Sequence, residues 1–228
     1  RFTSQRTHPA MQIAFGLYPG LTMLDFVGPY QVFANVPGLD LVVCAADRGR
    51  LDDDAGLVLL DVEHAFDDVT APDVVVVPGG FATRRLARER APIVDWLAAV
   101  HPTTTFTTSV CTGALLLGAA GVLDGLDATT HWCAYDALAG YGARPTEQRI
   151  VRQDRIWTAA GVSAGIDLAL TLVAELHGPV VAQAVQLGIE YDPQPPFDTG
   201  SPSKAGPDLV ALVRAVESSQ TDPLDRPA

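Results

Sequence analysis

The chain has 228 residues, 48% of them apolar, and a formal net charge of −12. This length and apolar content can bury a full core, of one large domain or of two small ones. The acidic balance argues against nucleic acid, because phosphate binding requires basic patches. No apolar run reaches the length of a membrane span, and the first residues lack the layout of a signal peptide. We therefore expect neither nucleic acid nor a membrane as partner.

Cysteine usage points to a reducing compartment. The chain has three cysteines, Cys44, Cys111 and Cys133, so they cannot all pair with one another. None of them lies in a C-x-x-C motif, which argues against a disulfide scaffold and against a structural zinc site. No glycine-rich nucleotide motif and no metal-ligand spacing is visible. We therefore predict a cytoplasmic protein with free thiols, without a metal and without a cofactor.

The first half of the chain predicts strands that alternate with helices. The expected elements are a flexible leader at 1–10, a strand at Gln12–Leu17, a helix at Met23–Val36 interrupted by Gly28 and Pro29, a strand at Leu39–Ala46, short hairpin strands within Arg48–Ala65, a core strand at Val74–Val77 and a helix at Ala91–His101. The near-continuously apolar strands are typical of a parallel sheet covered on both faces. An acidic triplet, Asp52–Asp54, is interpreted as a solvated loop because three consecutive side chains diverge in a turn.

The second half continues this alternation. The expected elements are a strand at Thr103–Val110, a helix at Thr112–Ala120, a segment at Leu126–Trp132 leading to a short helix at Tyr135–Gly140, a hairpin of Arg149–Val151 with Ile156–Ala159, helices at Ser163–His177 and Val180–Gly188, an irregular segment at Tyr191–Pro207, a last helix at Asp208–Ser218 and a flexible tail at 219–228. Short spacing between strands and helices predicts one α/β domain over 11–218. Its sheet is expected to be open and mostly parallel, with helices on both faces.

The stretch from Thr103 to Gly121 joins a strand to a helix through one cysteine. Cys111 stands at the joint, as in the strand–nucleophile–helix elbow that serine hydrolases build with G-x-S-x-G. The first N–H groups of the helix favour negative charge, so we expect this thiol to ionise more readily than a free one. The residues themselves leave two interpretations open, a catalytic nucleophile and a buried structural cysteine.

Two further strand ends carry residues that belong at the same edge, because sites in open α/β sheets gather at the carboxyl ends of strands. The first strand leads to Asp25, and the third core strand ends in a turn that contains Gly79 and Gly80. An N–H of this turn, together with that of Thr112, is expected to form an oxyanion hole. Each signal is weak alone, since such turns are common and an acid in a first helical turn is ordinary capping chemistry.

The chain resembles the ThiJ/PfpI superfamily, with its flavodoxin-like, class I glutamine amidotransferase-like fold, through the segments LYPGLTMLDFVGPYQVF, VVVVPGG, TSVCTGALLLGAAGVLDG, ATTHW and SAGIDLAL. The similarity runs from about Gln12 to about Ser203. Within the superfamily the chain is most similar to the isonitrile hydratases. The elbow is common to all members, whereas the combination of Asp-Phe-Val-Gly-Pro, Cys-Thr and Thr-His-Trp is narrower and also occurs in sensor domains of AraC-type regulators.

The resemblance implies a homodimer that hydrates isonitriles to N-substituted formamides without a cofactor. It implies that Cys111 is the nucleophile, that Asp25 is its acid–base partner and that Thr112 acts beside them. His131 and Trp132 are expected at the mouth of the pocket, although His131 could instead cap the short helix that follows it. Covalent catalysis of this kind requires Asp25 to keep its proton near neutral pH.

Departures from the pattern of the superfamily weigh on the alternatives. Thr112 stands where the intracellular proteases have His, and many relatives, including the cofactor-free glyoxalases, have Glu in place of Asp25. Two other functions stay open. One is a glyoxalase-like or protein-repair enzyme, and the other is a non-enzymatic ligand or stress sensor.

Overall fold

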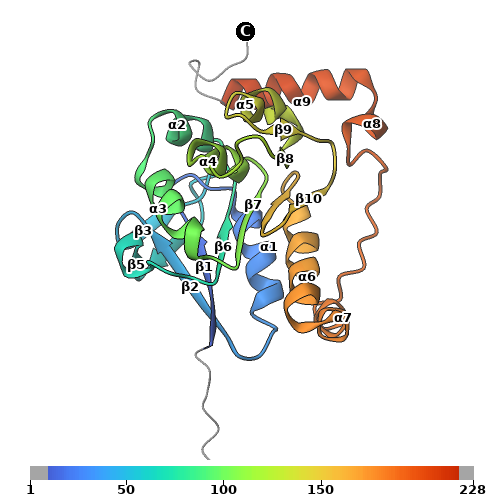
Figure 1. The fold of residues 1–228 in the computed structure, drawn as a ribbon. Coiled ribbons are helices and arrows are strands. Elements are labelled where there is room, and N and C mark those ends of the chain that lie inside the picture. The colour runs from blue at the N-terminus through green and yellow to red at the C-terminus, as the bar shows by residue number, and fades with distance from the viewer. Residues whose placement is uncertain (1–9, 221–228) are drawn as a thin grey trace, which may run out of the picture.

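The computed structural model describes residues 10–220, and a seven-stranded sheet forms its centre (Figure 1). The strands of this sheet are β1 (Met11–Gly16), β2 (Leu39–Ala45), β5 (His64–Ala65), β6 (Val74–Val77), β7 (Phe106–Val110), β10 (Ile150–Gln153) and β11 (Ile156–Ala159). They lie in the order β10-β11-β7-β6-β1-β2-β5. All neighbours are parallel except β10, which pairs with β11 in an antiparallel hairpin at one edge. The predicted open, mostly parallel sheet is confirmed.

Two small sheets accompany the central one. The antiparallel pair is formed by β3 (Gly49–Asp52) and β4 (Leu59–Val62), and the parallel pair by β8 (Asp127–Ala128) and β9 (Arg144–Pro145). The first pair is the hairpin expected between residues 48 and 65. Its loop docks on the segment after β1 through a bridge between Leu21 and Asp53. This contact brings the acidic turn of the hairpin close to the carboxyl end of β1.

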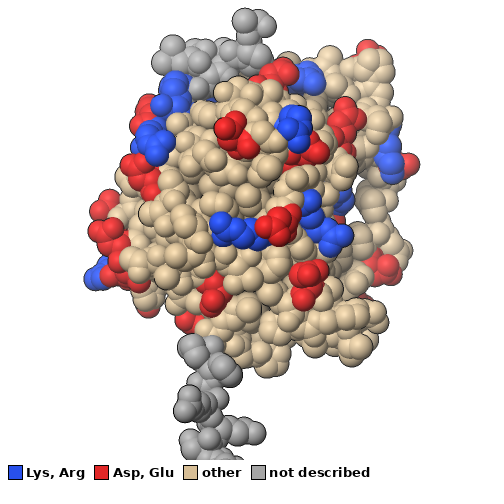
Figure 2. Space-filling model, viewed as in Figure 1, with Lys and Arg blue, Asp and Glu red and all other residues tan. Residues whose placement is uncertain are grey.

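Helices cover both faces of the sheet (Figure 1). They are α1 (Met23–Phe33), α2 (Thr83–Arg88), α3 (Pro92–Val100), α4 (Gly113–Ala119), α5 (Tyr135–Ala139), α6 (Ala164–His177), α7 (Pro179–Gly188), α8 (Pro202–Ala205) and α9 (Pro207–Gln220), with 3-10 turns at Phe66–Asp68, His101–Thr103 and Trp132–Ala134. One layer contains α1, α6 and α7, and the other contains α2, α3 and α4. On the face shown in Figure 2, acidic and basic side chains are interspersed.

Strand β6 shows why the core lies at the centre of the sheet. All four of its valines are buried, and its neighbours on either side are β1 and β7. β-branched side chains suit a pleated surface, and a parallel strand covered by helices on both faces has no polar side to expose. Because β1, β6 and β7 are parallel neighbours, their carboxyl ends lie side by side at one edge of the sheet. Sites of open α/β sheets form at this edge.

The predicted interruption of the first helix is wrong, because α1 continues through Pro29. Proline removes one helical N–H donor and strains the preceding turn. Here close packing against α6 holds the helix together: a Cβ on Gly28 would lie 3.1 Å from Cγ1 of Ile166, and a Cβ on Gly165 would lie 3.0 Å from Cγ of Pro29. Small residues on both helices thus let α1 and α6 approach each other.

Three other differences concern the ends and the short helices. Helix α2 was not expected, because Thr83–Arg88 lacks an apolar period, although arginine, leucine and alanine are strong helix formers. The segment predicted to be irregular contains α8, which begins with a proline in its first turn. Helix α9 runs to Gln220, two residues beyond the expected end. The leader expected at 1–10 and the tail expected at 219–228 lie mostly outside the described residues.

Candidate active site

Cys111 lies at the turn between β7 and α4, as the sequence predicted. Its φ of 55° is left-handed, a conformation that costs a non-glycine residue about 1–2 kcal/mol. Hydrogen bonds hold the turn: the N–H of Cys111 donates to the carbonyls of Ala159 (3.1 Å) and Ala160 (2.9 Å), and its own carbonyl accepts from Oγ1 of Thr130 at 2.9 Å. In this conformation Cys111 lines a cavity, although the residue is only 5% exposed.

The helix after the elbow packs unusually close to β6. A Cβ on Gly113, the first residue of α4, would lie 2.4 Å from the carbonyl oxygen of Val77. Only glycine fits at this position without displacing the backbone of the neighbouring strand. The close approach brings the start of α4 next to the turn that follows β6, so that the elbow and this turn share one site.

Asp25, in the first turn of α1, is fully buried beside the thiol of Cys111. Its Oδ2 accepts a hydrogen bond of 2.8 Å from the N–H of Gly79, while Oδ1 has no hydrogen-bond partner among the described residues. Burial raises the pKa of Asp25 to about 7, against the smaller opposing effects of the Gly79 amide and the Cys111 thiol. Oδ1, which accepts no hydrogen bond from the described residues, is therefore the oxygen available to carry this proton.

The prediction of an acidic thiol is wrong for Cys111 in this structure. Burial raises the pKa of Cys111 well above 9.0, and the neighbouring Asp25 raises it further. The backbone N–H of Thr112, at the start of the helix, lowers it, but this effect is smaller. Desolvation of a fully enclosed sulfur outweighs the helix terminus, because burial disfavours the charged form. The Asp25 carboxylate opposes ionisation of the thiol, whereas the neighbouring thiol lowers the pKa of Asp25, so the protonation states of the two groups are coupled.

The glycine turn after β6 makes different contacts from those expected of an oxyanion hole. The N–H of Gly79 donates to Asp25, and the N–H of Gly80 donates to Oγ1 of Thr112 at 2.9 Å. The Thr112 hydroxyl also lies 3.1 Å from the carbonyl of Gly80, to which it can donate. In this structure the two amides therefore position the acid and the threonine, and neither points unpaired at a ligand.

Glycine at position 79 is required by space. A Cβ there would lie 2.6 Å from the N of Thr112, 2.7 Å from its Oγ1 and 2.7 Å from Oδ2 of Asp25. The turn is also held from the other side, where the hydroxyl of Tyr18 donates to the carbonyl of Pro78 at 2.7 Å. The absence of a side chain thus lets the turn, the acid and the start of α4 meet.

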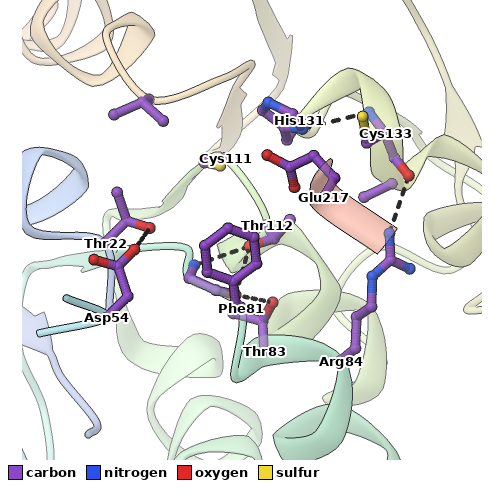
Figure 3. A pocket seen from close by; sticks show the side chains of 13 residues that line it. Thr22, Asp54, Phe81, Thr83, Arg84, Cys111, Thr112, His131, Cys133 and Glu217 are labelled. Atoms are coloured by element: carbon purple, nitrogen blue, oxygen red, sulfur yellow. Dashed lines mark hydrogen bonds between the residues drawn. The ribbon is translucent and has the colours of Figure 1, made fainter. Parts of the chain in front are cut away.

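The thiol of Cys111 opens into a cavity of about 240 Å³ (Figure 3). The cavity is lined by residues from the loop before α1, the β3–β4 loop, the turn after β6, α2, the elbow, the 131–134 segment, the loop before α6 and α9, namely Thr22, Asp54, Gly80, Phe81, Thr83, Arg84, Cys111, Thr112, His131, Cys133, Ala134, Val162 and Glu217. Its wall combines aromatic and aliphatic surface with a few charged groups. This lining suits a small organic ligand.

His131 fits both interpretations that the sequence left open. It lines the cavity, and its Nδ1 accepts the N–H of Cys133 at 3.4 Å at the start of the following 3-10 turn. Burial lowers its pKa, which favours the neutral ring. Trp132 does not line the cavity of Cys111. It faces a neighbouring cavity of about 500 Å³ that shares His131, and the guanidinium of Arg214 lies 4.9 Å from its ring centre.

Sequence reasoning missed three charged residues at this site, Asp54, Arg84 and Glu217. The acidic loop is more structured than predicted: Asp53 is buried, whereas Asp54 lies exposed at the cavity rim and accepts a hydrogen bond of 2.6 Å from the Thr22 hydroxyl. Arg84 belongs to the unexpected α2, and Glu217 to the far end of the chain. Asp54 belongs to the acidic triplet interpreted as a solvated loop, and no sequence motif marks Arg84 or Glu217.

The described part of the chain contains neither a candidate metal-binding cluster nor a candidate membrane-spanning helix. Within residues 10–220, no three His, Cys, Asp or Glu side chains are grouped so that they could hold a metal ion. Over the same residues, no helix has both the length and the apolar character needed to cross a bilayer.

A protein-family model described as the DJ-1/PfpI family matches residues 11–175. The chain belongs to the DJ-1/PfpI family. This membership agrees with the resemblance drawn from the sequence and with the fold. A solved structure of a THiJ/PfpI family protein from Pseudomonas syringae superposes with a TM-score of 0.87 and 38% identity, and the match covers 94% of this chain and 90% of that one.

Curated relatives within the DJ-1/PfpI family differ in function. Isonitrile hydratase of Pseudomonas putida is 43% identical over 205 residues, which cover 90% of this chain and 89% of that protein. The HTH-type transcriptional regulator CdhR of Pseudomonas aeruginosa is 34% identical over 180 residues, which cover 75% of this chain and 52% of the regulator. The family therefore contains both an enzyme and a regulator that resemble this chain.

Proposed function

We propose that this protein hydrates isonitriles to N-substituted formamides, with Cys111 as nucleophile and Asp25 as acid–base partner. The likeness to the Pseudomonas putida isonitrile hydratase supports an enzyme of this kind. The observation that carries the mechanism is the burial of Asp25 beside Cys111, whose thiol lines the cavity. One carboxyl oxygen of Asp25, Oδ1, has no hydrogen-bond partner among the described residues.

The first half of the reaction is the addition of the thiol across the isonitrile carbon. An isonitrile, R–N≡C, has a terminal carbon that accepts a proton and then a nucleophile. The raised pKa keeps a proton on Asp25 up to about pH 7, and this proton goes to the carbon. The sulfur of Cys111 forms the new C–S bond, and its own proton moves to the carboxylate just formed. The product is a covalent thioimidate, R–N=CH–S, and Asp25 is again protonated.

The second half is hydrolysis of the thioimidate. A water molecule adds to its carbon, one water proton reaches the nitrogen by way of Asp25, and the C–S bond then breaks. The sulfur leaves as a thiolate, takes up the remaining proton and releases R–NH–CHO. The sum is one isonitrile plus one water giving one formamide. Splitting the hydration in this way replaces one difficult addition by two easier steps.

The other site residues have supporting roles in this proposal. Thr112 and Gly80, joined by two hydrogen bonds, fix the turn over which the substrate enters. His131, neutral because burial lowers its pKa, and the ring of Phe81 line the cavity next to the reacting carbon. A wall of this kind suits an apolar R group. Trp132 lines the neighbouring cavity and not that of Cys111, so it has no part in this role.

The experiment that tests the function offers the protein two substrates of different chemistry. Cyclohexyl isocyanide should be converted to N-cyclohexylformamide, followed by chromatography and mass spectrometry. Methylglyoxal should be consumed slowly or not at all, because the acid here is Asp25 where glyoxalases of the superfamily have Glu. Consumption of methylglyoxal without any formamide would replace the hydratase by the glyoxalase-like alternative.

A ligand sensor is the second candidate, and the likeness to the regulator CdhR favours it. A sensor would bind a small molecule in the cavity without turnover. Binding of an isonitrile that shifts the melting temperature, with no formamide formed and no methylglyoxal consumed, would support the sensor and refute the enzyme. The homodimer and the cytoplasmic location stay predictions.

A further inference from the structure

The C-terminal helix α9 closes one wall of the catalytic cavity. Its Glu217 is half-buried and lines the cavity together with Cys111, although more than a hundred residues separate the two in sequence. One turn earlier in α9, the guanidinium of Arg214 stacks over the ring of Trp132 at 4.9 Å. Figure 3 shows the Glu217 carboxylate directed from α9 toward Cys111. The stacking contact therefore fixes the helix where its acidic side chain enters the cavity.

The negative charge of Glu217 reaches the sulfur. It is one of the charges that raise the pKa of Cys111, and it raises that of Cys133 as well. Burial raises the pKa of Glu217 itself, and the nearby Arg84 lowers it. Arg84 donates a hydrogen bond of 3.0 Å to the carbonyl of Cys133, so its guanidinium is held at the edge of the cavity. A ligand that approaches Cys111 thus passes a half-buried carboxylate.

We propose that Glu217 is a specificity-determining residue that excludes anionic ligands from Cys111. Under the proposed function, on which this assignment of substrate class rests, the isonitriles hydrated here carry neutral or cationic R groups. Asp54, on the opposite rim, adds a second carboxylate that an incoming anion must pass. Repulsion of like charges is strongest where water is excluded, so a carboxylate inside the cavity discriminates better than one on the open surface.

The charge filter can be measured without any isonitrile, by alkylation of Cys111. Iodoacetamide is neutral and iodoacetate is anionic, and with either reagent the thiolate displaces iodide to form a C–S bond. The rates are taken at low salt and about pH 8, where glutamate is ionised. Peptide mass spectrometry counts the adduct at Cys111 separately from that at Cys133. We expect Glu217→Gln to raise the ratio of the iodoacetate rate to the iodoacetamide rate by about fivefold, as for one partly screened charge.

Two variants make this result specific. Glu63→Gln removes the same charge at an exposed position on another part of the surface and should leave the ratio unchanged. Arg84→Gln removes the opposite charge at the cavity and should lower the ratio. A Glu217→Gln protein with a wild-type melting temperature and a wild-type ratio would overturn the proposal, and so would a shift of the same sign in the Arg84→Gln protein.

The same variants separate this proposal from the proposed function. We expect wild type to hydrate cyclohexyl isocyanide and to discriminate against isocyanoacetate, and Glu217→Gln to reduce that discrimination by a similar factor. If neither isonitrile is hydrated while the alkylation ratio shifts, the hydratase assignment fails and the charge filter stands. If both are hydrated with an unchanged preference in Glu217→Gln, the filter fails and the hydratase assignment stands.

Discussion

Replacement of Asp25 by Asn should change how the stability of the protein depends on pH. Burial raises the pKa of Asp25 in the folded protein from 3.8 to about 7. Between about pH 4 and pH 7 the folded protein therefore holds a proton that the unfolded chain has released. Because the unfolded state binds fewer protons there, the free energy of unfolding falls as the pH rises through this window. A difference of about 3 pH units corresponds to a fall of about 4 kcal/mol.

Asp25→Asn removes this titration, since an amide keeps the size and the neutral state at every pH. We expect the variant to gain about 3 kcal/mol relative to wild type between pH 4.5 and pH 8, as measured by urea unfolding at several pH values. Asp61→Asn, at an exposed position on β4, is the matched control and should follow the wild-type curve. If Asp25→Asn also follows that curve, Asp25 does not hold a proton in the folded protein, and the reasoning about the acid is refuted.

Three further predictions address the geometry of the site. Gly79→Ala should lower the free energy of unfolding by about 2–3 kcal/mol and suppress formamide formation, because its Cβ would press on Asp25 and Thr112. Gly188→Ala is the control: this residue of α7 has open space around it, so the variant should unfold at no lower temperature than wild type. Thr112→Val removes two hydrogen bonds to the glycine turn and should reduce kcat/KM by about tenfold. A variant with the kcat/KM of wild type would contradict the positioning role of Thr112. The alkylation of Cys111 by iodoacetamide should have its pH midpoint above that of a free cysteine, because burial raises the pKa of this thiol. Asp25→Asn should shift the midpoint downward by removing a negative neighbour, and an upward shift would contradict the coupling.

The fold and the elbow could be predicted because their signals are local. The run of four valines in β6 indicates a strand buried on both faces, and the Gly-Ala-Leu stretch after Cys111 indicates a buried helix. Once the strands are parallel, their carboxyl ends must meet at one edge, and this brings Asp25 toward the cysteine without any knowledge of distances. The same logic placed Gly79 at the site, but not the partner that its amide binds.

The remainder depends on tertiary packing that no short pattern encodes. Glu217 belongs to a helix that was expected, yet nothing in its sequence says against which part of the domain the helix packs. The prediction of an acidic Cys111 is wrong because the sequence indicates the helix terminus but not how far the sulfur is enclosed. Pro29 predicts a break in the first helix, but α1 continues through it. Gly28 and Gly165 let α1 and α6 pack closely, and this packing outweighs the cost of the proline.

The most direct test of the central claim is the rate of N-cyclohexylformamide formation from cyclohexyl isocyanide by wild type and by Cys111→Ala. Alanine removes only the sulfur from the elbow, and Cys44→Ala removes a buried thiol that lies in β2, outside the cavity. We predict turnover by wild type and by Cys44→Ala, and none above the uncatalysed rate by Cys111→Ala. Formamide production that survives in Cys111→Ala would contradict the assignment of this cysteine as the nucleophile.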